Sequence, residues 1–252
     1  MSEEIIRFQE LAHNAWLAKD NILYKGWILR QSEGVTRRAN SVLTVRYFGN
    51  DVQGDIESVE TLYESRNLPI IFQIASYYQP ENLIEILQSL KYKSEAETLV
   101  MSRSLNEHTS LEIDSKIDYI TEVGVTDEWF NTLKFLSNST LERIEGIKRI
   151  VSRNHLGKVV CYAKNNDSAV GTVLGIVQGQ SMGIYNLIVS REYRRQGIGK
   201  NIMIKTINWA KDNKIKEIYL AVEKENISAI SLYEKLGFSK KFNYKYYLKK
   251  SN

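Results

Sequence analysis

The sequence predicts an α/β protein with a mixed sheet, built as two successive domains. Strand-like and helix-like segments alternate in the first half of the chain, which is typical of an α/β arrangement. The second half contains three strand-like segments separated by short turns, which predicts an antiparallel meander. A length of 252 residues suits one large domain or two small ones, and 43% hydrophobic with 25% charged residues is ordinary for a globular protein.

The elements of the first half follow from the spacing of apolar residues. Residues 3–18 carry apolar side chains at helical spacing. Two segments rich in β-forming residues, 27–29 and 41–48, flank the turn-like residues 31–34 and predict a strand pair. The predicted order continues with a helix at 55–66, a strand at 68–74, a helix at 80–90 that begins with proline, and a strand at 97–105.

A polar segment at residues 106–116 is the predicted linker. It places the domain boundary after residue 112, so that the two domains comprise residues 1–112 and 113–252. The predicted elements of the second domain are a strand at 117–123, helices at 126–136 and 141–152, strands at 159–163, 169–178 and 184–189, a helix at 197–212, a strand at 217–222, a helix at 226–236 and a strand at 242–248.

Several classes of protein are excluded by composition. Cys161 is the only cysteine, so the chain has no intrachain disulfide and no cysteine-rich metal site. The three histidines are too far apart in sequence to indicate a metal cluster. The longest apolar run, residues 69–75, is too short to span a bilayer, and the start of the chain lacks the basic head of a secretory signal. We therefore expect a cytoplasmic protein without a metal.

Charge is distributed unevenly along the chain. Residues 1–125 contain 12 basic and 19 acidic residues, whereas residues 126–252 contain 22 basic and 11 acidic ones. The basic second half predicts an anionic partner. The total charge of +4 is too small to indicate nucleic acid or an anionic membrane, and the sequence leaves a homodimer open.

Residues 194–200, with the sequence RRQGIGK, form a glycine-containing loop between an apolar strand and a helix. Such a loop exposes backbone N–H groups at the positive end of the helix dipole, where they bind phosphate. Arg194, Arg195 and Lys200 add charged donors. The loop therefore predicts a pyrophosphate site; a helix end with solvated basic residues is the alternative.

A second segment supports the first. Residues 226–238, NISAISLYEKLGF, follow the loop by a helix and a strand. At this spacing the R-x-x-G-x-G loop and the N-x-x-A-x-x-L-Y-x-x-x-G-F segment together resemble the GNAT superfamily, the GCN5-related N-acetyltransferases. The resemblance implies acetyl-CoA as co-substrate and an amine acceptor. Residues 26–30 and 36–42 resemble the N-terminal region of two-domain bacterial members, so the first domain is interpreted as a degenerate GNAT-like domain.

The resemblance implies a set of acetyl-CoA-binding residues. The strand before the loop is expected to splay from its neighbour and offer backbone groups to the pantetheine arm, the loop to hold the pyrophosphate, and Asn226 to contact the pantetheine. The predicted residues are Leu187, Ile188, Val189, Arg194, Arg195, Gln196, Gly197, Ile198, Gly199, Lys200, Asn226 and Tyr233.

Tyr233 stands where the family places the phenol that protonates the leaving thiolate. A phenol has an ordinary pKa near 10, so it is protonated at neutral pH and can donate. The alternative is a core residue, because Ile230, Tyr233 and Leu236 share a helix face.

The general base is less clearly marked. The positions at which relatives carry a carboxylate are occupied here by Ala221 and by residues 183–185, none of which is acidic. Strand alternation puts Glu223 on the same face as Ala221, so Glu223 is the nearest replacement. A solvated Glu223, a water chain and a group from the first domain stay open as alternatives.

The first domain offers a candidate acceptor site at Arg37, Arg38 and Asn40. We expect Arg37 and Asn40 to orient a carboxylate of the acceptor, and Arg38 to lie in a solvated turn.

The resemblance implies an N-acetyltransferase in which the amine attacks the thioester directly. The oxyanion is expected to meet a backbone N–H at or next to Ile188. Cys161 is expected in the core, so no covalent enzyme intermediate is predicted. The alternatives are a non-catalytic acyl-CoA-binding sensor or regulatory module and an interaction protein without ligand. The acceptor is left open: an amine-bearing small molecule, such as a small amine, an amino acid or an antibiotic, or a peptide such as a protein N-terminus.

Overall fold

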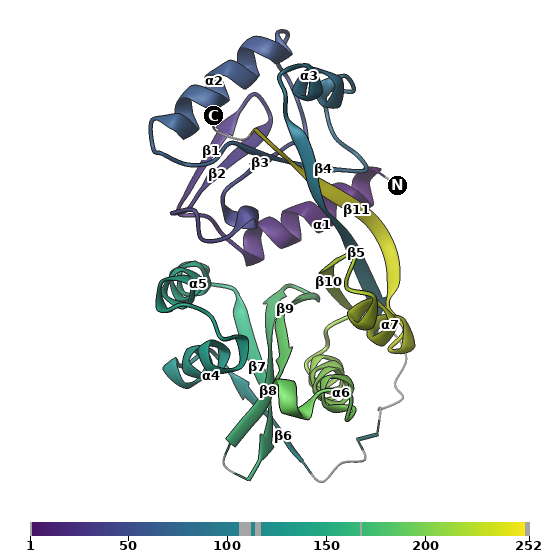
Figure 1. The fold of residues 1–252 in the computed structure, drawn as a ribbon. Helices are drawn as coiled ribbons and strands as arrows, with labels where there is room; N and C mark the ends of the chain where they lie inside the picture. The colour runs from purple at the N-terminus through teal and green to yellow at the C-terminus, as the bar shows by residue number, and fades with distance from the viewer. Residues whose placement is uncertain (1, 106–111, 114–116, 167, 250–252) are drawn as a thin grey trace.

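In the computed structural model, the chain forms one eleven-stranded mixed sheet with helices on its faces (Figure 1). The structure describes residues 2–105, 112–113, 117–166 and 168–249. Most of the predicted linker at 106–116 therefore lies outside the described residues, and the boundary after residue 112 stays a prediction. The strand order is β1-β2-β3-β4-β11-β5-β10-β9-β8-β7-β6.

The elements of the first half agree in most places with the sequence prediction. They are α1 (Ser2–Ala15), β1 (Asp20–Tyr24), β2 (Trp27–Gln31), β3 (Val42–Leu43), α2 (Val52–Glu64), β4 (Ile71–Ala75), α3 (Leu83–Ser89) and β5 (Lys93–Ser104). Strand β1 was not predicted, because this edge strand alternates half-buried with exposed residues and carries little apolar signal.

The predicted strand at residues 41–48 was wrong beyond Leu43. Only Val42 and Leu43 pair with neighbouring strands. The backbone that follows is bound by a loop instead: the Tyr47 N–H donates to the Gln79 side chain (3.1 Å), and the Gln79 N–H donates to the Thr44 carbonyl (3.4 Å). These contacts satisfy backbone groups that a strand would have paired. The helix predicted from Pro80 begins three residues later, at Leu83.

The second half follows the prediction closely. Its elements are β6 (Asp118–Val123), α4 (Asp127–Ser137), α5 (Leu141–Arg153), β7 (Gly157–Asn165), β8 (Ser168–Gln178), β9 (Ser181–Val189), α6 (Ile198–Asp212), β10 (Glu217–Glu223), α7 (Ile227–Lys235) and β11 (Ser239–Leu248). Strands β6 to β9 form the predicted antiparallel meander.

The two halves exchange strands. The C-terminal strand β11 lies between β4 and β5, both from the first half, and β5 in turn pairs with β10 from the second half. Figure 1 shows β5 and β11 running side by side across the middle of the molecule. Each half of the sheet is therefore completed by the last strand of the other.

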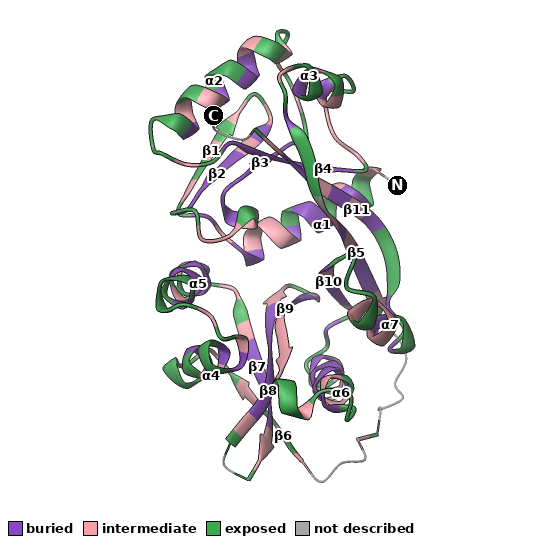
Figure 2. Ribbon diagram, viewed as in Figure 1, coloured by how far each residue is buried: buried purple, intermediate pink, exposed green. Residues whose placement is uncertain are grey.

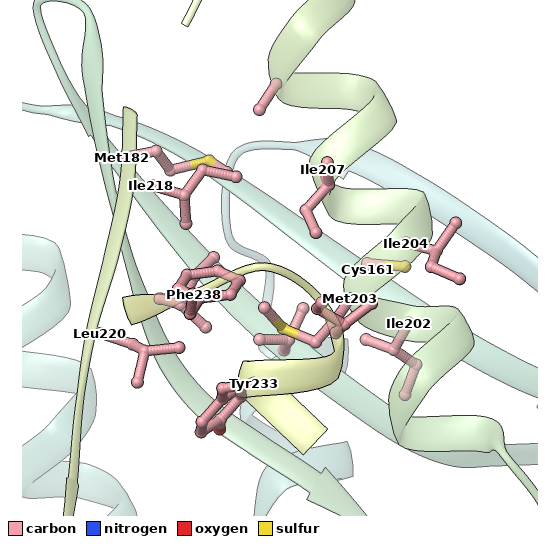
Figure 3. Packing of buried hydrophobic residues seen from close by; sticks show 14 of the residues in the cluster. Cys161, Met182, Ile202, Met203, Ile204, Ile207, Ile218, Leu220, Tyr233 and Phe238 are labelled. Atoms are coloured by element: carbon pink, nitrogen blue, oxygen red, sulfur yellow. The ribbon is translucent and has the colours of Figure 1, made fainter. Parts of the chain in front are cut away.

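Helix α1 joins the halves from one face of the sheet. Its Phe8 ring contacts Tyr219 on β10 (5.8 Å between centroids) and Phe242 on β11 (6.3 Å). A separate apolar core forms around α6, with Ile202, Met203 and Ile207 fully buried against the second half of the sheet (Figure 3). Figure 2 shows the buried residues along the central strands and on the helix faces turned toward them. Apolar burial of this kind is the main stabilising contribution in folding.

Candidate functional site

Strands β9 and β10 pair in parallel and then diverge. Their register runs from Ser181 opposite Glu217 to Ile184 opposite Leu220, although β9 continues to Val189 and β10 to Glu223. A register shift in the β8–β9 ladder and a left-handed Asn186 (φ 52°) accompany the divergence. On the side toward β10, backbone groups of β9 beyond Ile184 therefore face a gap, whereas on the other side β9 stays paired with β8. The divergence from β10 agrees with the sequence analysis.

A cavity of about 790 Å³ lies at this gap and reaches into the first half of the chain. The second half contributes residues of β9, β10 and α7, among them Leu187, Glu223, Asn226 and Tyr233. The first half contributes Trp16 at the end of α1 and the loop that carries Arg37 and Arg38; these three also line the cavity. The cavity thus combines side chains that are far apart in sequence.

The loop at residues 194–200 has the geometry of an anion site. Arg195 (φ 64°) and Gly197 (φ 79°) are left-handed, and α6 begins at Ile198. The hydrogen bonds of the described chain give no protein acceptor to the backbone N–H groups of residues 195–200. A Cβ at Gly197 would meet no atom of the described residues within 4 Å, so this turn is open to a ligand. Several free N–H groups at a helix N-terminus suit a pyrophosphate.

The predicted side chains of the loop divide into two groups. The Nε of Arg194 donates to the Val189 carbonyl (3.2 Å), and Nε2 of Gln196 donates to the Glu192 carbonyl (3.1 Å), so both hold the shape of the loop. Arg195 and Lys200 are exposed and have no ion pair with another described residue. Their charge is available to an anion at the helix end.

Asn226 occupies the N-cap of α7, next to the cavity. Its side-chain oxygen accepts from the Ala229 N–H (3.2 Å) and from the Ser228 hydroxyl (3.1 Å). The cap leaves the amide nitrogen of Asn226 as a donor at the cavity wall.

Tyr233 combines the two interpretations made from sequence. Its ring packs against Phe238 (5.9 Å between centroids) at the edge of the α6 core, where Figure 3 shows it. Tyr233 also lines the cavity, and no hydrogen bond to its hydroxyl is present within the described chain. Burial raises the pKa of Tyr233 to about 12, so the phenol is protonated at neutral pH.

Glu223 is the carboxylate of this cavity. It lies exposed at the end of β10, and the other described residues of the lining include no Asp, Glu or His. Burial is the largest influence on three phenols near the cavity and raises the pKa values of Tyr185, Tyr219 and Tyr246. These phenols are therefore donors and poor bases.

Of the two acceptor-binding residues predicted in the first half, one lines the cavity and the other does not. Arg37 lines the cavity and forms an exposed ion pair with Glu95 (3.1 Å). Asn40 is buried in its own loop: its Oδ1 accepts from the Ser32 N–H (2.7 Å) and the Gly34 N–H (3.1 Å). Because Asn40 is not part of the cavity wall, the structure does not bring it together with Arg37 there.

The expectation that Arg38 is solvated was wrong. Its guanidinium lies over the rings of Trp16 (5.8 Å) and Tyr185 (5.3 Å), which stack on each other at 5.2 Å. The Trp16 indole N–H also donates to the Thr36 hydroxyl (3.1 Å). This bond holds the loop that carries Arg37 and Arg38, the arginine loop, against the end of α1. Sequence reasoning missed Trp16 and Tyr185 because both occupy positions typical of core residues.

The chain is similar to known acetyltransferases. A family model described as "Probable histone acetyltransferase Rv0428c C-terminal" matches residues 3–247. The chain is 32% identical over 254 residues to YobR of Bacillus subtilis strain 168, described as an uncharacterized N-acetyltransferase, and the match covers 98% of this chain and 100% of YobR. The chain belongs to the GNAT superfamily. It is an acetyltransferase.

The GNAT fold also connects the chain with solved structures. A GCN5-related N-acetyltransferase from Kribbella flavida superposes with a TM-score of 0.74 at 10% identity, over 98% of this chain and 96% of the other. A tandem GNAT protein from the clavulanic acid biosynthesis pathway gives a TM-score of 0.68 at 10% identity, over 97% and 88%. The predicted tandem GNAT arrangement is confirmed.

Three further findings concern the cysteine, metal-binding groups and the helices of this GNAT protein. Cys161 is buried on β7, and burial raises the pKa of its thiol to about 12, which keeps it out of nucleophilic chemistry at neutral pH. No cluster of metal-binding side chains occurs in the part of the chain that the structure describes. None of the described helices has both the length and the apolar composition to cross a membrane.

Proposed function

We propose that the protein transfers an acetyl group from acetyl-CoA directly to an amine acceptor. The observation that carries this proposal is the divergence of β9 and β10 beside a helix N-terminus whose N–H groups are free. Gly199 links the two features, because a Cβ there would lie 3.6 Å from Val189 on β9 and 3.7 Å from Leu232 on α7.

The backbone N–H groups of residues 195–200 bind the pyrophosphate in this proposal, with charge from Arg195 and Lys200. Arg194 and Gln196 act by shaping the loop. Backbone groups of residues 187–189 on the side of β9 that has diverged from β10, together with the Asn226 amide, bind the pantetheine arm. Acetyl-CoA supplies a thioester whose acetyl group can be transferred.

The protein's own groups have three tasks. A backbone N–H at or next to Ile188 donates to the carbonyl oxygen on which negative charge develops. Tyr233 holds a proton for the leaving sulfur, which its raised pKa secures at neutral pH. Glu223 accepts the proton of the amine, directly or through water, because it is the carboxylate beside the cavity.

A thiol-release assay over small amines, amino acids, aminoglycosides and peptides tests the proposal. We expect release that depends on both acetyl-CoA and one class of amine. Calorimetry with acetyl-CoA accompanies the assay. Binding of acetyl-CoA without transfer to any amine would favour a sensor, and absence of binding would contradict the assignment of the loop.

A further inference from the structure

We propose that the acceptor is a small amine that also carries a carboxylate, and that Arg38 and the polar pocket behind it bind this carboxylate. The inference rests on the proposed function and specifies its substrate class. Beside the large cavity there is a second, smaller pocket of about 30 Å³ between α1, the sheet and the arginine loop. That space shares Arg38, Tyr185 and Tyr244 with the large cavity, so the two adjoin.

The charged side chains that line the small pocket are all positive among the described residues. Arg30 and Arg38 line it, and its described lining contains no Asp, Glu or His. Arg30 is fully buried and donates to the Ser41 carbonyl (3.0 Å), the Ser41 hydroxyl (2.6 Å) and Oε1 of Gln73 (2.8 Å). None of these partners is an anion. A guanidinium stays charged in proteins, and a buried charge without a counterion is costly.

Arg38 has no ion pair with any described residue either. Its guanidinium contacts the aromatic faces of Trp16 and Tyr185, which fix its position, and it also forms a hydrogen bond with the Tyr244 side chain. A guanidinium has five N–H donors, so others are left for another group. Carboxylates match this planar fork in a bidentate manner. An anion bound here would offset the charge of both arginines.

The neutral groups of the pocket are also donors. Gln9 is 3% exposed, and its Nε2 is buried without a hydrogen-bond partner among the residues that the structure describes. The hydroxyls of Tyr185 and Tyr219 lie 3.4 Å apart, and both phenols are protonated because burial raises their pKa values. A free buried donor is rare in native proteins, since each one costs stability. The described lining therefore offers neutral acceptors, such as the Oε1 of Gln73 that Arg30 already occupies, but no anion, which a carboxylate would supply.

Arg38 lies in the same cavity as the residues proposed to carry out the transfer. The large cavity extends from Arg38 to Tyr233 and Glu223, so one ligand can reach both ends. When the acceptor's carboxylate is bound at Arg38, its amine can extend along the cavity toward Glu223 and the predicted acetyl site. The enclosed pocket admits the end of a small molecule, which favours an amino-acid-like zwitterion over the N-terminus of a folded protein.

Matched pairs of acceptors test the inference. Proteinogenic amino acids are compared with their carboxamides and with the corresponding decarboxylated amines, at saturating acetyl-CoA, by thiol release. Because hydrogen bonds to a charged group contribute enough for roughly a 10- to 100-fold change, we expect kcat/KM for the preferred acid to exceed that of its amide by this factor. Equal values for acid and amide would overturn the inference and leave the proposed function intact.

The variant Arg38→Met keeps an apolar stem against Trp16 and removes the charge. It should lower the acid-to-amide ratio of kcat/KM toward one, with acetyl-CoA affinity unchanged. Gln9→Leu, a second variant, should reduce the same ratio. Arg66→Met is the matched control, because Arg66 forms an exposed ion pair with Asp20 in the first half, outside the cavity.

The outcomes separate the two proposals. An acid-to-amide ratio that stays unchanged in both Arg38→Met and Gln9→Leu would contradict the carboxylate site alone. Transfer only to aminoglycosides or peptides of the wider panel would overturn the substrate inference and leave the proposed function intact. Acetyl-CoA binding without transfer to any amine of that panel would contradict the proposed function, and the substrate inference with it.

Discussion

Tyr233 shows how one residue can be part of the core and of the site. Its ring packs in the α6 core, and its hydroxyl has no partner among the described residues, so removal of the oxygen leaves the packing unchanged. The structure therefore predicts a separation between stability and catalysis at this position. A phenol whose pKa is raised to about 12 can donate a proton at neutral pH.

We expect Tyr233→Phe to lower kcat by about 100-fold, the usual contribution of a general acid, with acetyl-CoA affinity nearly unchanged. Steady-state kinetics and calorimetry give the two quantities. Tyr92→Phe is the control, since Tyr92 donates to Glu60 away from the cavity and its loss should leave kcat unaltered. Weaker acetyl-CoA binding with normal kcat would assign Tyr233 to binding instead.

His13 on α1 predicts a pH dependence of stability. Burial, with the charge of Arg30, lowers the pKa of His13 from 6.5 to about 4. The unfolded chain therefore takes up a proton at higher pH than the folded chain, so stability is fully present above pH 6.5 and falls as the pH falls toward 4. Urea unfolding should show a loss of about 2 kcal/mol between pH 8 and pH 5 from this residue.

The variant His13→Gln should remove that part of the pH dependence. His155→Gln provides the comparison, because His155 is exposed and should leave the wild-type profile in place. A profile that is the same for both variants would show that His13 does not cause the loss.

Among the elements, the loop before α6 was predictable and the arginine loop of the first half was not. The former follows from a continuous stretch of sequence, an apolar strand, two glycines and an amphipathic helix. The latter depends on Trp16 and Tyr185 meeting across the two halves, and a contact between distant residues leaves no local pattern. Contacts with distant residues also explain why the sequence predicted a solvated turn at Arg38 and a strand at residues 44–48.

The left-handed turn at Gly197 provides an element-level test. Gly197 and Gly179 both have positive φ (79° and 59°) and open space where a Cβ would lie. Alanine at either position should cost a similar amount of stability, about 1 kcal/mol, because of the backbone strain. Only Gly197→Ala should weaken acetyl-CoA binding in calorimetry. Equal affinity in the two variants would contradict the role of this turn.

For the molecule as a whole, the strand exchange explains much of the charge pattern. Acidic residues of the first half pair with basic residues of the second at Glu33–Arg149, Glu4–Lys241, Glu60–Lys249, and Glu97 with both Lys224 and Lys245. Such exposed pairs contribute little stability each, but they match the two halves in sign. The asymmetry seen in sequence therefore reflects contact between the halves, in addition to the anionic ligand proposed for the loop at residues 194–200.

The exchange also predicts that both halves unfold together. Tyr247 on β11 is buried in the core of the first half, although its strand belongs to the C-terminal segment. Tyr247→Ala should destabilise the protein by about 3 kcal/mol. Hydrogen exchange should show the same loss of protection in β2 and in β8, since a shared sheet unfolds cooperatively. Faster exchange in β2 alone would mean that the halves unfold independently.

The central claim is direct transfer of acetyl from acetyl-CoA to an amine at the gap between β9 and β10. Mass spectrometry after incubation with acetyl-CoA that carries a deuterated acetyl group tests it most directly. The account predicts the label on the nitrogen of the acceptor amine, with none on the protein. Label found only in free acetate, or retained on acetyl-CoA with every amine tested, would contradict it.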